Sequence, residues 1–110
     1  MPEELSYKDF KKLDIRIGTV KTCEKVEGSD KLYKLLVDCG EDEPRQILSS
    51  LVDWYTAEEL VGKVIPVLVN LKPAKIFGQY SYGMLLAAEV GDECVLLTTD
   101  RKIENGARIT

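Results

Sequence analysis

The residues best suited to bind a charged ligand lie together at positions 70–84, which read NLKPAKIFGQYSYGM. The chain has a net charge of −4, yet positions 61–87 contain three lysines and no Asp or Glu. The same stretch carries the aromatic residues Phe77, Tyr80 and Tyr82. Lysine attracts phosphate, and an aromatic ring stacks on a nucleobase. The stretch therefore indicates a cationic, aromatic loop that meets a nucleic-acid backbone, and the alternative is an ordinary surface connection.

Catalytic chemistry has little support in this composition. The chain has no histidine, so neither a Ser-His-Asp nor a Cys-His nucleophile can form, and the commonest general base is missing. Cys23, Cys39 and Cys94 are odd in number and far apart, which argues against a zinc site and a disulfide framework. We expect no catalytic residue, no metal and no cofactor. The cysteines fit small core thiols in a reducing cytoplasm, so we expect a cytoplasmic protein. Catalysis by carboxylates alone is the alternative, but no acidic pair stands in a motif that favours it, so we expect a protein that is not an enzyme.

Length and charge set further bounds. The 110 residues fit one domain, 1–110, and a content of 45% hydrophobic and 31% charged residues is typical of a soluble globular fold. No apolar run approaches ~20 residues, so we expect no membrane span, and the acidic N-terminus lacks the apolar region of a signal peptide. The sequence pI near 4.9 counts against binding of polyanions by the whole surface. A local cationic patch still acts by itself, because salt screens charges beyond ~10 Å.

The N-terminal half predicts a helical segment followed by three strands. Residues 1–13 contain Ser6 and Asp9 in a helix-capping pattern, with an apolar face that docks on the barrel or on a second subunit. Residues 14–26 alternate as a strand whose apolar phase slips after Gly18, which predicts a bulge or a sharp coil there. Residues 31–39 and 45–49 are the next two strands and form a hairpin.

The C-terminal half predicts a helix and further strands. Residues 51–61 are a short helix, because Thr56 and Glu59 form a capping box and a glycine ends it. Residues 63–71 are a fourth strand, in which Pro66 must lie at an edge or a bulge. Strands at 82–89 and 94–98 follow, and residues 99–110 add a turn and a final short strand.

This order of elements predicts an all-β fold. A Greek-key barrel of the OB-fold type, with a short helix between the third and fourth strands and small N- and C-terminal additions, fits best, and a β-sandwich is the alternative. The barrel proper spans 14–98. OB barrels bind ligands on the second and third strands and the adjacent loops, which brings Lys31, Lys34 and Arg45 to the 70–84 loop. The alternatives are a solvated strand face for the lysines and core roles for Phe77, Tyr82 and Met84.

Five segments, in this order and spacing, resemble those of a known family: FKKLDIRIG at 10–18, SDKLY at 29–33, ILSSL at 47–51, NLKPAK at 70–75 and SYGM at 81–84. They resemble the tRNA-binding domain that is found free or C-terminally appended with methionyl-tRNA synthetases. Related domains occur in the yeast synthetase cofactor and in the endothelial-monocyte-activating polypeptide. The resemblance implies a non-catalytic OB-fold module that recognises the outer corner of tRNA by shape. It also implies a homodimer and a methionyl-tRNA synthetase catalytic chain as partner.

The resemblance also implies RNA contacts at matching positions. These are Lys31, Asn70, Lys75, Ser81 and Met84, and their neighbours Lys72 and Arg45 are added as further candidates. Family members often carry a basic residue before the loop glycine, where this chain has Phe77, so one phosphate contact is lost or replaced by stacking. The alternative in the same superfamily is the CsaA-type secretion chaperone, a dimeric barrel that binds peptides.

Overall fold

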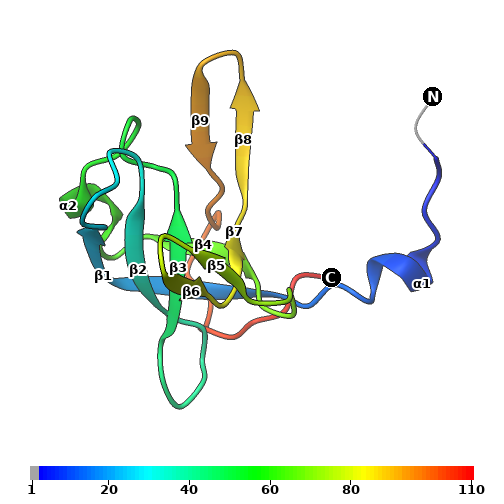
Figure 1. Ribbon diagram of the computed structural model, residues 1–110. Helices are drawn as coiled ribbons and strands as arrows, with labels where there is room; N and C mark the ends of the chain where they lie inside the picture. The colour runs from blue at the N-terminus through cyan, green and yellow to red at the C-terminus, as the bar shows by residue number, and fades with distance from the viewer. Residues whose placement is uncertain (1–2) are drawn as a thin grey trace.

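Five antiparallel strands curl into a nearly closed barrel in this computed structural model, which describes residues 3–110 (Figure 1). The sheet order is β3-β2-β1-β4-β7. The strands are β1 (Ile15–Lys25), β2 (Tyr33–Asp38), β3 (Arg45–Ser49), β4 (Val64–Leu68) and β7 (Met84–Leu85). The predicted all-β barrel of the OB-fold type is confirmed, with the helix α2 (Ala57–Leu60) between the third and fourth strands.

The core fills the barrel with side chains that alternate inward along these strands. The largest fully buried ones are Val20, Leu35, Val37, Ile47, Ile65 and Val67, and α2 adds Leu60. The predicted bulge at Gly18 was misplaced, because the register of β1 against β2 shifts between Val20 and Thr22. Gly18 instead allows close packing: a Cβ there would lie 2.7 Å from Val37 Cγ1 and 2.9 Å from Cys39 Sγ.

Two short helices flank the barrel. The capping box predicted for α2 is present, since Glu59 N–H donates to Thr56 Oγ1 and Thr56 N–H donates to Glu59 Oε1. The hydrogen bond from the Thr56 backbone N–H, followed by that from its side chain, holds the pKa of the Glu59 carboxyl below its ordinary value. The helix is shorter than the predicted 51–61, because turns precede it. The other helix, α1 (Tyr7–Phe10), is capped by Ser6, buries none of its own residues and lies to one side of the barrel (Figure 1).

Pro66 lies where β4 is still an edge. It pairs with Ile17 of β1 on one side, while pairing with β7 on the other side begins only at Val67. The missing N–H of the proline therefore breaks no ladder, as the sequence predicted.

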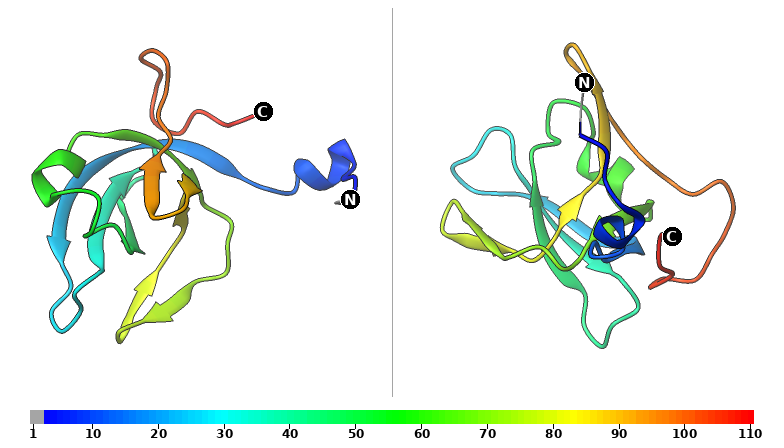
Figure 2. Two further views of the ribbon diagram at one scale, coloured as in Figure 1. Left: turned by 90° about the horizontal axis from the view of Figure 1, so that it is seen from above. Right: turned by 90° about the vertical axis from the view of Figure 1, so that its right-hand side faces the viewer.

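Two small hairpins extend from the barrel. One consists of β5 (Ala74–Ile76) and β6 (Gln79–Ser81), and the other of β8 (Ala87–Val90) and β9 (Glu93–Leu96). The chain end then returns along β1 through a bridge between Arg16 and Arg108, and Figure 2 shows it passing near the N-terminal segment. None of the helices among residues 3–110 is long and apolar enough to cross a membrane.

Candidate nucleic-acid interface

The cationic stretch found in the sequence folds as the β5–β6 hairpin, which has two distinct faces. Lys75 and Tyr80 are cross-strand partners, and both are exposed. Ile76 packs on the small apolar cluster of Val26, Leu32 and Leu48. One face of the hairpin therefore completes the protein interior, and the opposite face presents a lysine beside an aromatic ring to solvent.

Phe77 forms the tip of this hairpin. The two-residue turn Phe77–Gly78 has positive φ at both positions, 51° and 78°, as a type I′ turn requires. Phe77 is 61% exposed and approaches Gly28 in the turn between β1 and β2. A bulky residue in the left-handed region is uncommon, because its Cβ crowds the following carbonyl. The tip of the hairpin thus carries an exposed ring on a strained backbone.

Ser81 closes the barrel. Its side chain is only 5% exposed, its Oγ accepts from Leu48 N–H at 3.0 Å, and its hydroxyl donates to Gly83 O at 3.0 Å. Next along the chain, Tyr82 N–H donates to Gln46 O at 2.9 Å. The serine hydroxyl and this backbone bond together join β6 to the free edge of β3.

Arg45 links three segments at the same edge. Its guanidinium forms a two-pronged ion pair with Glu41, at 2.7 and 2.9 Å, and donates to Val69 O at 3.2 Å and to Tyr82 O at 2.8 Å. Its side chain is 25% exposed. The forked shape of arginine suits such a multiple contact, so Arg45 positions the start of the loop and its end.

Asn70 holds the N-terminal segment. Its Oδ1 accepts from Asp14 N–H at 2.9 Å, and its Nδ2 donates to Lys12 O at 2.7 Å. The side-chain amide of Asn70 therefore bonds to the backbone just before β1, as a neighbouring strand would.

The predicted lysines and Met84 lie in different surroundings. Lys72 and Lys75 are exposed on the loop and hairpin. Lys31 forms an ion pair with Asp53 at 3.3 Å. Both residues line a cavity together with Trp54 and the tip of the β8–β9 hairpin. Trp54 is joined to that tip, since its Nε1–H donates to Asp92 O. Met84, at the start of β7, lines an open groove of about 310 Å³ with Ser49 and Ser50.

The seven predicted contacts therefore fall into separate groups. Arg45 and Ser81 lie together at the β3 edge, and Lys72 and Lys75 lie on the adjacent loop and hairpin. The other three lie apart from these: Asn70 at the N-terminal segment, Lys31 near the β8–β9 hairpin and Met84 in the groove at β7. Lys34, also placed at the site by sequence, is half-buried and pairs with Glu24 at 3.1 Å.

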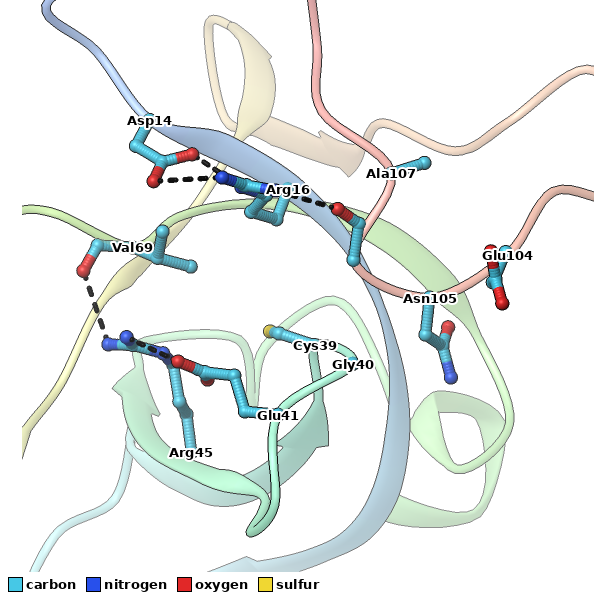
Figure 3. Close-up of a pocket in the computed structure, with 11 residues that line it drawn as sticks. Asp14, Arg16, Cys39, Gly40, Glu41, Arg45, Val69, Glu104, Asn105 and Ala107 are labelled. Carbon is cyan, nitrogen blue, oxygen red and sulfur yellow. Dashed lines mark hydrogen bonds and ion pairs between the residues drawn. The ribbon is translucent and has the colours of Figure 1, made fainter.

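A second cavity, of about 560 Å³, lies at the base of the barrel, between the Cys39–Glu41 turn and the returning chain end (Figure 3). Arg16 donates to Asp14 at 2.6 Å, and this bond holds the pKa of the Asp14 carboxyl below its ordinary value. Burial raises the pKa of the Cys39 thiol to about 11, so it is protonated at neutral pH. Both arginines that line this cavity, Arg16 and Arg45, are paired with carboxylates. No pattern in the sequence indicated the cavity.

Comparison with known proteins places these features in a family. The model of the family described as "Putative tRNA binding domain" matches residues 15–108. The methionine–tRNA ligase of Archaeoglobus fulgidus is 55% identical over 97% of this chain, and that of Thermotoga maritima is 49% identical over 96%. The chain spans only 16% and 17% of the length of those two proteins.

Two solved structures have the same fold over almost the entire chain. A MetRS-related protein from Pyrococcus horikoshii superimposes with a TM-score of 0.92 at 38% identity, and covers 99% of this chain and 100% of its own. The chaperone CsaA from Bacillus anthracis superimposes with a TM-score of 0.88 at 29% identity, and covers 98% of this chain and 100% of its own.

Proposed function

The chain belongs to the tRNA-binding domain family, and we propose that it binds tRNA through the surface around the β5–β6 hairpin. We further propose that it is a non-catalytic module that assists a methionyl-tRNA synthetase, as a subunit or as a domain. Relatives that are methionine–tRNA ligases support this partner, although the chain corresponds to a small part of each. The cytoplasm is the compartment in which such a partner would be met.

One observation carries the RNA-binding proposal. In a protein with a net charge of −4, the exposed Lys72 and Lys75 lie in a stretch of chain without carboxylates, on a loop that β3 holds in place. The Debye length at physiological salt is about 8 Å, so a phosphate that approaches these ammonium groups is little affected by distant acids. The loop therefore attracts an RNA backbone locally.

The seven predicted residues take two roles in this proposal. Lys31, Lys72, Lys75 and Met84 are exposed and would contact RNA directly. The side chains of Arg45, Asn70 and Ser81 already make hydrogen bonds within the protein, so they would act by positioning the backbone that meets the RNA.

A homodimer is the proposed assembly. Leu5, Tyr7 and Leu13 in and around α1 are exposed apolar side chains, and α1 lies beside the barrel rather than on it. Burying these side chains against a second copy would remove apolar surface from water. Sedimentation at micromolar concentration tests the dimer, and a monomer there would contradict it.

The test of RNA binding is a titration of full-length tRNA across salt. We expect the logarithm of the binding constant to fall linearly with the logarithm of salt, by about 0.7–0.9 per neutralised phosphate. Replacing both Lys72 and Lys75 by Gln should lower the slope by about 1.5. Lys102→Gln, an exposed lysine in the returning chain end, is the matched control and should keep the wild-type slope. A wild-type slope for the double variant would contradict the site.

Peptide binding is the second candidate function. It is favoured by the groove at Met84, whose walls include Leu51, Leu86 and Ala87, and by the fold shared with the chaperone. Tight, salt-insensitive binding of an unfolded peptide, with no binding of tRNA in the same buffer, would favour this alternative over the first proposal.

A further inference from the structure

Two tyrosines lie side by side on the outward face, one in β6 of the cationic hairpin and one just after it. Tyr80 and Tyr82 are 47% and 43% exposed. Their ring centroids lie 6.2 Å apart, and the ring planes are tilted by 31°. This spacing is that of a contacting aromatic pair. The two rings are in contact and both are partly exposed, so a flat ligand would lie on their exposed side rather than between them.

The backbone under both rings is fixed to β3. Gln46 Nε2 donates to Tyr80 O at 2.9 Å, and Gln46 O accepts from Tyr82 N–H at 2.9 Å. Arg45 holds the carbonyl of Tyr82, as described above. A ligand that stacks on the rings therefore does not have to order the chain that carries them, and pre-organisation of this kind raises affinity.

The charge around the rings differs between their two ends. The Lys75 ammonium lies 6.0 Å from the centroid of the Tyr80 ring. Tyr82 instead borders an open cleft of about 750 Å³ whose other walls include Glu41, Asp42 and Glu43. Phosphate is attracted at the Tyr80 end and repelled at the Tyr82 end, so a nucleotide would place its phosphate by Lys75 and its base over the rings.

We propose that Tyr80 and Tyr82 form a stacking platform for unpaired nucleobases, with Lys75 as the contact for the adjoining phosphate. Bases inside a duplex are covered by their neighbours, so this surface selects single-stranded or extruded nucleotides. The inference rests on the proposed function, and it adds a ligand class that shape recognition of folded tRNA does not require.

The experiment measures anisotropy of two fluorescein-labelled RNAs, an oligo(A) of about ten nucleotides and a blunt-ended duplex of two complementary strands. Tyr80→Ala and Tyr82→Ala should each weaken oligo(A) binding by roughly 5- to 150-fold, the range for loss of one stacked base. Tyr80→Phe keeps the ring and should stay within about twofold of wild type. Affinity for the duplex should be the same in all four proteins, because the platform meets no paired base.

Salt dependence separates stacking from charge. Tyr80→Ala should leave the salt slope of oligo(A) binding unchanged, whereas Lys75→Gln should reduce it by about 0.7. Ile103→Ala is the control, since Ile103 is another exposed apolar side chain, but it lies in the returning chain end. It should bind oligo(A) as wild type does. Circular dichroism melting of each variant establishes that the barrel is folded.

Three outcomes would overturn the platform: wild-type affinity for oligo(A) in both tyrosine-to-alanine variants, an equal loss in Tyr80→Phe, or an equal loss in Ile103→Ala. Failure of the proposed function gives a different result. In that case the wild-type protein itself does not bind full-length tRNA. If wild type binds tRNA while the alanine variants retain oligo(A), the platform alone is wrong and the tRNA proposal stands.

Discussion

Replacing Ser81 with Ala tests how the barrel closes. The hydroxyl is both an acceptor for Leu48 N–H and a donor to Gly83 O, and it is buried. Alanine fits the same space and leaves the amide of Leu48 without its partner. An unpaired buried donor costs about 1–3 kcal/mol, so we expect the free energy of unfolding to fall by roughly 2 kcal/mol.

That loss corresponds to a measurable change in melting temperature. The unfolding entropy of globular proteins is about 2.1 cal/mol/K per residue, so ~2 kcal/mol lowers the Tm of this 110-residue chain by roughly 9 °C. Thermal melting followed by circular dichroism measures the shift. Ser50→Ala, which changes an exposed serine on the same side of the barrel, is the control and should change the Tm by less than about 2 °C.

The same variant distinguishes closure of the barrel from direct RNA contact. If Ser81 acts by holding the backbone, any loss of tRNA affinity should come together with the lowered Tm. A variant with wild-type Tm and weakened tRNA binding would refute the reasoning and make the hydroxyl an RNA contact. A variant unchanged in both respects would show that the two hydrogen bonds contribute nothing to closure.

Three further expectations follow from side chains near the site. Arg45→Lys keeps the charge but cannot replace four hydrogen bonds, so urea denaturation should show a loss of about 1–3 kcal/mol. The pKa of Asp14 is lowered by the hydrogen bond from Arg16, so its stabilisation is present above its ordinary pKa of 3.8 and is lost as pH falls through the lower folded value. Asp14→Asn should flatten the dependence of stability on pH there, and an unchanged acid profile would contradict this. Phe77→Asn creates the Asn-Gly pair that a type I′ turn favours, so it should raise stability by about 0.5–1 kcal/mol in thermal melting. A lower Tm would mean that packing of the ring matters more than backbone strain.

Much of the fold could be predicted because its signals are local. Alternation with a period of two placed the strands, and the capping box of Thr56 and Glu59 placed the start of α2. Gly18 shows the limit of such signals. A phase slip at a glycine indicated a bulge, but the glycine is needed for contact with β2, which is distant in the sequence.

The candidate site was predicted in position but not in internal structure. The 70–84 stretch was expected to be a loop, yet it contains a hairpin, because Phe77-Gly78 lacks the usual turn composition. The partners of Ser81 and Asn70 lie 33 and 58 residues away from them in the sequence, at Leu48 and Lys12. No local pattern shows that these polar side chains make internal hydrogen bonds, so their expected role as RNA contacts stays a prediction.

The two faces of the β5–β6 hairpin have a consequence for how such proteins diversify. Ile76 and Ser81 on the inward side maintain the barrel, while Lys75 and Tyr80 on the outward side have no part in the core. Substitutions on the outward side therefore alter what the surface attracts with little effect on folding. During evolution, a surface that binds phosphate can therefore be replaced by an apolar one while every variant along the way still folds. This gives one barrel a physical route to different ligands.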